Sequence, residues 1–459
     1  MNTRLTLGIA CAAALVALAV PRARSDSKPG TANPKSLVYT PRPANTLTFT
    51  KDVAPILFAN CASCHRAGEV APFTLTSYAD AAKRAKTIVS VVEKRVMPPW
   101  KAAPGPAYVD ECHLTDDQIG LIKQWAAEGA KEGNPNDLPA MPNFPNGWRN
   151  GEPDLVIEMP EPFTVPAEGR DIYQNFVIPT GFTDDKWLSA VEIHPGNRRV
   201  VHHVLVHLDT SGKARELDAK DPGPGYRSGG GVGFRSAGQI GGWAPGNIAR
   251  RAPDGLGVNM PKNSDIVIQV HYNLNGKRET DRTKIGIYFA KGPVDKSIRL
   301  FPLASRINIP AGEASYTTTA SMPVPSDVTL RSVMPHMHLL GRDIRVFATL
   351  PGGQELPLVH VPDWDFNWQN SYAFKEPVKL PRGSKVTLEA RYDNSDKNPR
   401  NPNSPPKPVR WGEQTTDEMC LAYLNFTVDS ESLTQGKAVP TVADIVRQLG
   451  DARKKKQDK

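Results

Sequence analysis

The sequence has 459 residues, with 43 prolines, 36 glycines, 5 cysteines and a formal net charge of +8. A chain of this length is expected to form about three domains. Its proline content argues against a helical bundle or coiled coil, because proline removes a backbone donor and breaks helix interiors. The charge implies no nucleic-acid partner, since residues 453–459 carry a net +4 and residues 1–25 a net +3, which leaves +1 for the rest. The composition therefore predicts a turn-rich multidomain protein without a basic binding face.

The first 25 residues have the pattern of an export signal. Arg4 is followed by an apolar stretch over residues 5–20, which is too short for a comfortable membrane span, and the small residues Ala23 and Ser25 precede a possible cleavage site. An uncleaved anchor is the alternative. We therefore expect a signal peptide over residues 1–25, a periplasmic or secreted protein, and no integral membrane span after cleavage.

Cys61, Cys64 and His65 form the motif C-x-x-C-H. In this motif the two thiols bond covalently to the vinyl groups of haem c, and the adjacent imidazole becomes the proximal ligand of the iron. A disulfide redox site or half of a zinc site would need a thioredoxin-like βαβ context or a second ligand pair, and the sequence has neither pattern. The motif therefore predicts a covalently bound haem c.

The residues around this motif have the pattern of a small all-α domain. A short helix over residues 51–59 is expected to lead into the motif, and an amphipathic helix is expected over residues 79–96. The sequence T-D-D-Q at 115–118 is a capping box that begins a third helix. We expect a cytochrome c domain over residues 47–135, preceded by an N-terminal linker over residues 26–46.

Met97 is the candidate for the second axial ligand of the haem iron. It stands directly before Pro98 and Pro99, which stop the preceding helix and stiffen the loop that would hold the thioether at the haem. Ligation by histidine and methionine leaves no open position and raises the potential, so such a module would carry electrons and would not itself activate dioxygen. A methionine of the apolar core is the alternative.

Beyond residue 135 the pattern changes from helical periodicity to short strands. Residues 136–165 are rich in proline, asparagine and glycine, which is typical of an interdomain linker. The runs that follow predict two antiparallel, jelly-roll-like β-sandwich domains, over residues 166–295 and 296–432. Residues 433–459 are expected to form a basic C-terminal tail with one short helix over 442–449. The expected strands cover residues 200–208, 265–272, 343–350, 385–392 and 421–428.

Five histidines of the β region stand in a pattern that favours metal binding. His336 and His338 form H-x-H, and residues i and i+2 of a strand point to one face, so both can bind one ion. His202 and His203 are adjacent, so they can serve one ion only at a bulge or a strand end. His271 lies in a third expected strand. Imidazole suits copper, zinc, iron and nickel alike, so the spacing predicts a metal without naming it, and buried histidines without a metal are the alternative.

Four motifs, in this order and at these separations, resemble the copper type II, ascorbate-dependent monooxygenases, which include peptidylglycine α-hydroxylating and dopamine β-monooxygenases. The resemblance covers roughly residues 152–430, including the stretch at 364–394, and the preceding cytochrome resembles those fused to such domains in bacteria. The motifs are VHHVLVHL at 201–208, QVHYN at 269–273, PHMHLLGR at 335–342 and DEMCLAYLNF at 417–426.

The resemblance implies two different copper ions, an electron-transfer copper in the first sandwich and a catalytic copper in the second. Three imidazoles make a site that can cycle between both oxidation states, whereas a soft thioether beside two imidazoles stabilises Cu(I), the state that must meet dioxygen. Met419 depends on the resemblance, because a core methionine would otherwise be favoured. The implied ligands are His202, His203 and His271 for the first copper, and His336, His338 and Met419 for the second.

The implied reaction is the hydroxylation of a carbon–hydrogen bond of a small organic substrate by dioxygen. Each turnover consumes two electrons from an external donor, ascorbate or a redox protein, and we hypothesise that the haem relays them. The alternative function is a periplasmic copper and haem electron-transfer protein without oxygenase activity. Such a carrier would need no second, dissimilar copper site.

The resemblance is incomplete where the substrate would bind. Met334 and Leu421 replace an arginine and an asparagine that help to hold the peptide carboxylate in the peptidylglycine enzymes, whereas the matching tyrosine remains as Tyr423. A glycine-extended peptide is therefore not expected as substrate, and a more apolar molecule is. Cys112 and Cys420 could pair in an oxidising compartment or remain free.

Overall fold

The structure, a computed structural model, describes residues 39–439 except 68, 70, 145–146 and 229–230. The expected signal peptide and the expected helix over 442–449 lie outside the described residues. The chain divides into two compact units. One, here the helical unit, comprises described residues of 18–100 and 110–146, and the other, the β unit, comprises 101–109 and described residues of 147–459. None of the helices in the described ranges has both the length and the apolar character that a membrane crossing requires.

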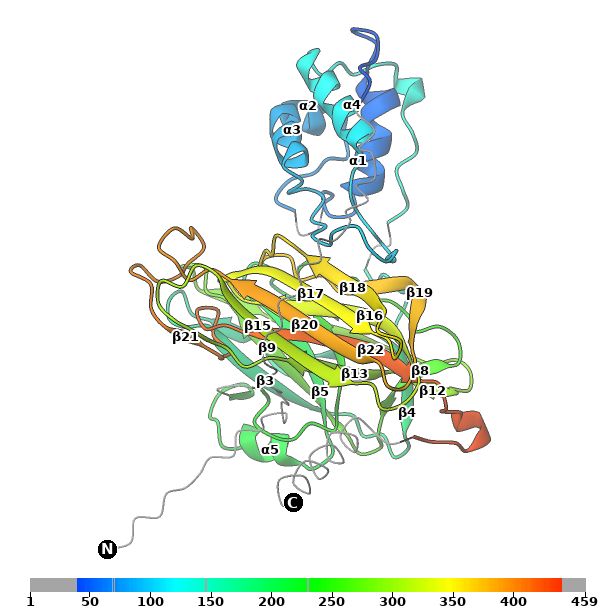
Figure 1. Cartoon of the computed structure of the whole chain (residues 1–459), viewed down its shortest axis with the longest axis vertical. Coiled ribbons are helices and arrows are strands. Elements are labelled where there is room, and N and C mark those ends of the chain that lie inside the picture. The colour runs from blue at the N-terminus through cyan, green and yellow to red at the C-terminus, as the bar shows by residue number, and fades with distance from the viewer. Residues whose placement is uncertain (1–38, 68, 70, 145–146, 229–230, 440–459) are drawn as a thin grey trace, which may run out of the picture. The chain divides into compact units, whose positions relative to one another are not determined.

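The helical unit consists of short helices around one apolar core (Figure 1). Leu57, Ile122 and Trp125 are fully buried in this core, and burying one large apolar side chain contributes about 1.5–3 kcal/mol. The unit therefore has a core of its own, although its assignment as a cytochrome c domain stays a prediction. Its helices are η1 (Phe49–Val53), α1 (Ala54–Asn60), α2 (Tyr78–Lys83), α3 (Ala85–Glu93), α4 (Asp116–Ala127) and η2 (Pro135–Asp137).

The helix expected after the capping box begins where the sequence predicts, whereas the helix expected over 79–96 is interrupted. The side chain of Thr115 accepts a hydrogen bond from the backbone of Gln118, and the Gln118 side chain accepts one in return, so α4 begins as expected. The helix expected over 79–96 is divided at Arg84, which leaves the helical conformation (φ −113°, ψ 9°). The guanidinium of Arg84 turns back to Asp80 O and lies over the ring of Phe73. These contacts favour two short helices over one long one.

The first part of the β unit is a sandwich of two five-stranded sheets that share one apolar core. Strand orders are β1-β11-β4-β8-β12 and β6-β3-β9-β5-β7, with a separate pair β10-β2. The central strand β9 is buried along its whole length, as its sequence DIVIQVHY suggests. Bounds are β1 (Leu155–Glu158), β2 (Phe163–Val165), β3 (Ile172–Pro179), β4 (Lys186–His194), β5 (Val201–Asp209), α5 (Lys213–Asp218), β6 (Tyr226–Arg227), β7 (Gly238–Trp243), β8 (Leu256–Met260), β9 (Asp265–Tyr272), β10 (Glu279–Asp281), β11 (Lys284–Phe289) and β12 (Lys296–Ser297).

The second part of the β unit pairs two four-stranded sheets. Strand orders are β13-β22-β16-β19 and β15-β20-β17-β18, with a separate pair β14-β21, and the long strands are labelled in Figure 1. The five strands expected from the sequence are all confirmed, each within two residues at its ends. Bounds are β13 (Arg299–Ala304), β14 (Asn308–Ile309), β15 (Tyr316–Pro323), β16 (Val328–Met337), β17 (Gly341–Thr349), β18 (Glu355–Val361), β19 (Tyr372–Leu380), β20 (Lys385–Tyr392), β21 (Val409–Arg410), β22 (Cys420–Val428) and η3 (Leu433–Gln435).

The segment expected as a linker over 136–165 already contains two strands of the first sandwich. β1 pairs with β11 and β2 pairs with β10, so both strands find partners more than 100 residues away. Met159 and Phe163 are buried in the sandwich core. The correction has a physical reason: proline-rich composition conceals a strand of three or four residues, and only long-range pairing defines it.

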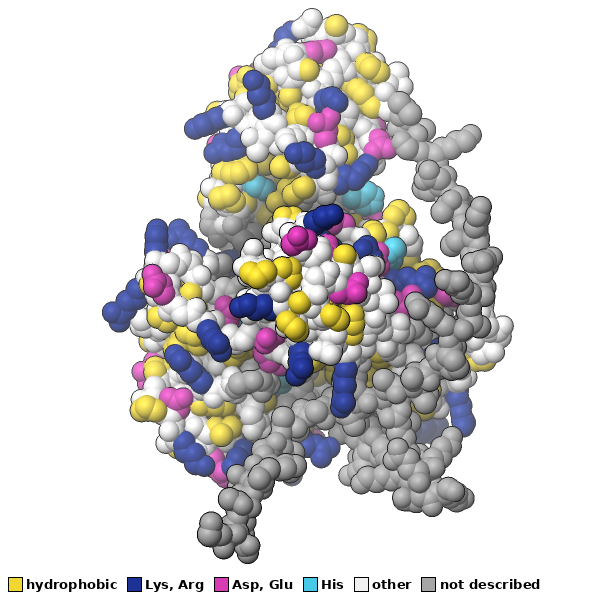
Figure 2. Space-filling model, turned by 60° about the vertical axis from the view of Figure 1, so that its left-hand side comes forward, with side chains coloured by type: hydrophobic (Ala, Val, Ile, Leu, Met, Phe, Trp, Pro, Cys, Tyr) yellow, Lys and Arg dark blue, Asp and Glu magenta, His cyan; other side chains and the backbone are white. Residues whose placement is uncertain are grey.

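Figure 2 shows one face of the molecule, on which lysine and arginine side chains are interspersed with acidic and apolar ones.

Glu192 is an acidic side chain that is largely buried. Glu192 of β4 is 5% exposed and accepts hydrogen bonds from Arg149 N at 2.7 Å, Asn150 Nδ2 at 2.9 Å and His194 Nε2 at 2.9 Å. Burial alone would raise the pKa of Glu192, but these hydrogen bonds outweigh it and lower the pKa to about 2.

Glu192→Gln is expected to remove an acid-sensitive part of the stability. A carboxyl group with a lowered folded-state pKa stabilises the fold above its unfolded value near 4.5, and that contribution, roughly 3 kcal/mol here, is lost as the pH falls towards 2. Thermal unfolding between pH 7 and pH 3 should show a steeper decline for the wild type. Glu158→Gln is the matched control, because Glu158 forms only surface ion pairs. Equal declines in the wild type and Glu192→Gln would contradict the assignment.

Candidate metal centres

The first candidate centre is formed by two neighbouring strands of the first sandwich. β5 carries His202 and His203, and β9 carries His271. The register of this strand pair shifts between Val201 and His203, so His202 is the extra residue of a bulge. The bulge turns two adjacent histidines towards one point. The structure therefore brings the three predicted ligands together, and the bulge allows the adjacent His202 and His203 to point to the same place.

The geometry of the three imidazoles fits a bound metal ion. One nitrogen from each ring lies within 4.8 Å of the others. The Nδ1 atom of His203 is 3.3 Å from Nδ1 of His202 and 3.3 Å from Nδ1 of His271. Two metal–nitrogen bonds of about 2.0–2.1 Å at a tetrahedral angle would place their nitrogens about 3.4 Å apart. Burial and then the neighbouring histidines lower the pKa of His202 to about 3, so its ring is neutral and offers a lone pair at pH 7.

His271 is oriented by side chains that the sequence analysis missed. Its Nε2 atom is 3.2 Å from Asp171 Oδ2, and its ring stacks on Tyr173 with centroids 4.2 Å apart. A carboxylate on one ring nitrogen leaves the other for a metal and fixes the ring orientation. Thr415 Oγ1 donates to Asp171 Oδ2 at 2.5 Å, and Tyr173 OH donates to Glu413 O. A loop of the second sandwich therefore completes the surroundings of a histidine in the first.

The second candidate centre lies at the end of β16. The rings of His336 and His338 are nearly perpendicular, with centroids 5.2 Å apart. His336 Nδ1 donates to Gln369 Oε1 at 2.6 Å, and His338 Nδ1 donates to Asp417 O at 3.1 Å. Both Nδ1 atoms are thus engaged, and each Nε2 remains available as a ligand. Burial lowers the pKa of His336 to about 4, which keeps its ring neutral.

Met419 is linked to this pair through its neighbour Glu418. The Glu418 carboxyl is 0% exposed and accepts hydrogen bonds from His338 N at 2.8 Å, Leu340 N at 2.7 Å and Met419 N at 3.1 Å. One buried carboxyl therefore ties the backbone of a predicted histidine ligand to that of the predicted methionine ligand. Glu418 was not singled out from the sequence, although it stands inside the motif that contains Met419. Coordination by the Met419 thioether stays a prediction.

The sheet face beside His336 is mostly apolar. His336 lies opposite Leu421 and Met334 opposite Tyr423 in the pairing of β16 with β22, and directly opposite residues share one face. Leu421 and Tyr423 also pack with Met419 and Ala304. Burial raises the pKa of Tyr423 to about 12, so its hydroxyl stays protonated. Tyr423, a predicted site residue, is thus placed on the same face as the histidine pair.

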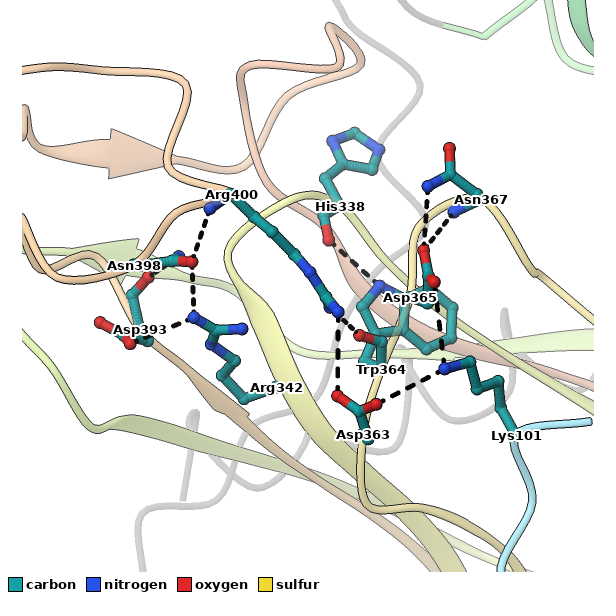
Figure 3. Close-up of polar contacts among 10 residues, drawn as sticks. All are labelled: Lys101, His338, Arg342, Asp363, Trp364, Asp365, Asn367, Asp393, Asn398 and Arg400. Atoms are coloured by element: carbon teal, nitrogen blue, oxygen red, sulfur yellow. Dashed lines mark hydrogen bonds and ion pairs between the residues drawn. The ribbon is translucent and has the colours of Figure 1, made fainter. Parts of the chain in front are cut away.

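A single loop between β18 and β19, residues 362–371, touches both candidate centres. Phe366 stacks on His202 with centroids 4.6 Å apart and meets His338 edge-on at 5.6 Å. Trp364 Nε1 donates to His338 O at 3.1 Å, as Figure 3 shows, and Gln369 of the same loop holds His336. Phe366 and Trp364 lie in the stretch 364–394 that carries part of the resemblance, but neither was singled out as a site residue, because aromatic residues between strands usually serve a core.

The predicted haem residues of the helical unit stand at the end of α1. Cys61 and Cys64 carry free thiols, and His65 N donates to Cys61 O at 2.9 Å. His65 Nδ1 donates to Phe73 O at 3.0 Å, which leaves Nε2 free, as a proximal iron ligand requires. These residues fit haem c. Met97 lies in the loop after α3, and its role as second ligand stays a prediction.

Three further side chains, His207, Cys112 and Cys420, stand outside the predicted ligand sets. His207, on the same strand as His203, is partly buried, and neither of its ring nitrogens has a hydrogen-bond partner among the described residues. The four cysteines in the described part of the chain are free. Cys420 is fully buried in the β unit, whereas Cys112 belongs to the helical unit, where its Sγ lies 3.7 Å from Asn60 O. The two thiols therefore form no disulfide in this structure.

Fold and sites together define a protein with two β-sandwiches and a candidate metal centre in each. Residues 303–438 match the family model described as copper type II ascorbate-dependent monooxygenase, C-terminal domain. DBH-like monooxygenase protein 1 of Homo sapiens is 29% identical over 127 residues, covering 28% of this chain and 19% of that protein. DBH-like monooxygenase protein 2 of Mus musculus is 25% identical over 218 residues, covering 43% and 33%. The second sandwich therefore resembles the C-terminal domain of copper type II monooxygenases, and the matches span a third or less of the length of these relatives.

Among solved structures, the infectious bursal disease virus VP2 subviral particle aligns with a TM-score of 0.16 and 6% sequence identity. That alignment covers 66% of this chain and 89% of the viral chain. A likeness this weak supports no statement about function. The comparison therefore rests on sequence, and the family model matches within the second sandwich.

Proposed function

We propose that this chain is a copper-dependent monooxygenase that hydroxylates a carbon–hydrogen bond of a small organic substrate with dioxygen. The observation that carries the proposal is the presence of two dissimilar centres within one unit. Three imidazoles converge through Nδ1 in the first. In the second, the Nδ1 atoms of two imidazoles are engaged, and one oxygen of Glu418 binds the backbone amides of both His338 and the buried Met419. An electron carrier would have no use for this second arrangement.

Copper at the two centres would supply the activation of dioxygen and the one-electron steps of the reaction. The chain's own residues would prepare this chemistry. His202, His203 and His271 would hold the electron-transfer copper, and Met419 would join His336 and His338 at the catalytic copper. Gln369 and Asp417 fix the orientation of His336 and His338 through their Nδ1 atoms. Phe366 packs against the rings of His202 and His338, and Trp364 binds the backbone carbonyl of His338.

The substrate is proposed to be apolar and to lack a carboxylate. Met334, Leu421 and Tyr423 share the sheet face with His336, and none of them is a cation that could pair with a carboxylate. The protonated hydroxyl of Tyr423 can donate one hydrogen bond to orient a substrate oxygen. This arrangement favours dispersion contacts and a single polar contact over an ionic anchor.

We infer further that a haem c bound at Cys61, Cys64 and His65, with Met97 as second ligand, relays electrons to the copper centres. The reaction RH + O₂ + 2e⁻ + 2H⁺ → ROH + H₂O needs two electrons from outside, from ascorbate or a redox protein. Two features support the relay: the fusion of the C-x-x-C-H motif to an electron-requiring unit, and the free Nε2 of His65. The export signal expected over 1–25 supports a periplasmic or extracellular location for the proposed enzyme.

Metal analysis together with reductant-dependent dioxygen uptake tests the proposed function. Purified protein should contain two coppers and one haem per chain, and labelled dioxygen should place one oxygen atom in an organic product. One copper with no uptake would instead point to the periplasmic electron-transfer protein. The double variant Cys61→Ala, Cys64→Ala tests the relay separately. If it turned over at the wild-type rate with every reductant, the haem relay would be abandoned.

A further inference from the structure

The loop 362–371, which touches both candidate centres, is itself held by a residue from a distant part of the sequence. Lys101 Nζ lies 3.5 Å from Asp363 Oδ2 and 3.9 Å from Asp365 Oδ2. The side chains of Lys101 and Asp365 are 11% and 19% exposed, so their pair is less screened by solvent than a surface pair, whereas Asp363 is 71% exposed and its pair is screened more. Figure 3 shows Lys101 pointing at the two aspartates that flank Trp364. Asp365 is the immediate neighbour of Phe366.

Residues 101–109, here called the strap, pair with both strands that this loop connects. On the β18 side, Ala103 N donates to His360 O at 2.8 Å. On the β19 side, Val109 N donates to Ala373 O at 2.8 Å, and Lys375 N donates to Ala107 O at 2.9 Å. The strap thus links β18 and β19, the two strands that flank loop 362–371, by backbone hydrogen bonds.

Tyr108 anchors the strap in the second sandwich. Its side chain is 2% exposed, and its hydroxyl donates to Leu358 O at 2.8 Å. Its ring packs against Tyr372 and Phe374, with centroids 5.3 Å and 5.8 Å away. A buried aromatic ring with a satisfied hydroxyl is a rigid attachment. The strap is therefore an integral part of the β unit rather than a passing linker.

The strap is nevertheless encoded inside the helical unit. Described residues of 18–100 and 110–146 belong to that unit, so the chain leaves it, contributes the strap to the β unit, and returns. Met97, the predicted second haem ligand, precedes Lys101 by only four residues. The covalent path from the predicted haem loop thus runs directly into the segment that holds loop 362–371.

We propose that the strap, through Lys101, is a positioning element that sets loop 362–371, and with it Phe366 and Gln369, against the histidines of both centres. The role of the strap at the copper centres rests on the proposed function. The contacts of the strap with loop 362–371 do not depend on a bound metal. Without the ammonium group, Asp363 and Asp365 lose a cation that they share, and the loop loses the tie that fixes its aromatic side chains. Arg400, which donates to Trp364 O, then remains as the second cation at this loop.

Lys101→Met in the full chain tests the proposal, because it keeps the apolar stem and removes the charge. In metal-free protein, amide hydrogen exchange at residues 362–371 is expected to become severalfold faster. In copper-loaded protein, copper affinity at His336 and His338 is expected to fall about 10- to 100-fold, the usual effect of removing support from a metal ligand. The Cu(II) electron paramagnetic resonance spectrum of that centre should change, while the signal of the three-histidine centre should change less. Lys101→Arg should restore both properties.

Lys291→Met is the matched control, because Lys291 pairs with Asp154 in the first sandwich and lies outside both centres. Unchanged exchange of the loop in Lys101→Met would overturn the proposal, and so would faster exchange with an unaltered copper spectrum and affinity. If the wild type bound no copper, the proposed function would fail, whereas the exchange experiment alone would still decide whether the strap holds the loop.

Discussion

His338→Ala is expected to abolish reductant-dependent dioxygen uptake while leaving the other copper in place. His338 is one of two imidazoles at the second centre, and because its Nδ1 donates to Asp417 O, its Nε2 is the ligand atom that the variant loses. The first centre lies on other strands and keeps all three of its imidazoles. Metal analysis should therefore fall from two coppers per chain to one, and uptake in an oxygen electrode should fall to the background rate.

His203→Ala and His360→Ala complete this experiment. His203 is the middle member of the first cluster, with Nδ1 contacts to both of its partners, so its loss should remove the other copper. The His360 side chain is 42% exposed and pairs only with Asp343 among the described residues, and the alanine variant keeps the backbone carbonyl that binds the strap, so it should match the wild type. Uptake that survived in His338→Ala would place dioxygen activation elsewhere and favour the electron-transfer alternative.

The strands and the histidine clusters were predictable because local pattern specifies them. Strand β9 was expected over its observed length, since its run of β-branched and apolar residues ends at turn signals on both sides. The H-x-H spacing of His336 and His338 gives one face by the two-residue period of a strand. For His202 and His203, the sequence indicated only that a bulge or a strand end would be needed for both to bind one ion. The register of β5 against β9 contains that bulge.

The residues that sequence did not indicate act through contacts across the chain. Asp171 reaches Thr415, and Lys101 reaches Asp363, over separations of more than 200 residues. The periodicity of apolar residues along the sequence does not indicate a contact between residues so far apart. Phe366 is similar, because an aromatic residue in a loop becomes informative only when two histidine rings are found on either side of it. Local pattern thus predicted the ligands, whereas the groups that orient them required the fold.

These long-range contacts make the two sandwiches interdependent. His271 belongs to the first sandwich, yet Thr415 and Glu413 of the second hold the carboxylate and the tyrosine beside it. His202 is covered by Phe366, also from the second. Each candidate centre is therefore supported by a loop of the second sandwich, and a change in either loop should be felt at both centres.

Glu418→Leu is expected to destabilise the second sandwich by roughly 3 kcal/mol or more, because each buried donor left without a partner costs about 1–3 kcal/mol and the Glu418 carboxyl serves three of them. The change should also loosen His338 and Met419, whose backbone amides share one oxygen of this carboxyl. Urea unfolding of metal-free protein, followed by copper titration of the variant, measures both effects. A variant as stable as the wild type would show that the three amides find other acceptors.

Glu418→Gln separates the charge of this group from its shape. Burial raises the pKa of Glu418 to about 8, and the backbone hydrogen bonds that oppose this shift are the smaller effect. Between about pH 4.5 and pH 8 the folded protein therefore holds a proton that the unfolded chain releases, so stability falls as pH rises, by up to about 1.4 kcal/mol per pH unit. The sign is opposite to that for Glu192, whose contribution is lost as pH falls. Metal-free Glu418→Gln should lack the decline, Glu389→Gln on the surface of β20 should retain it, and an equal decline in Glu418→Gln would assign it to another group.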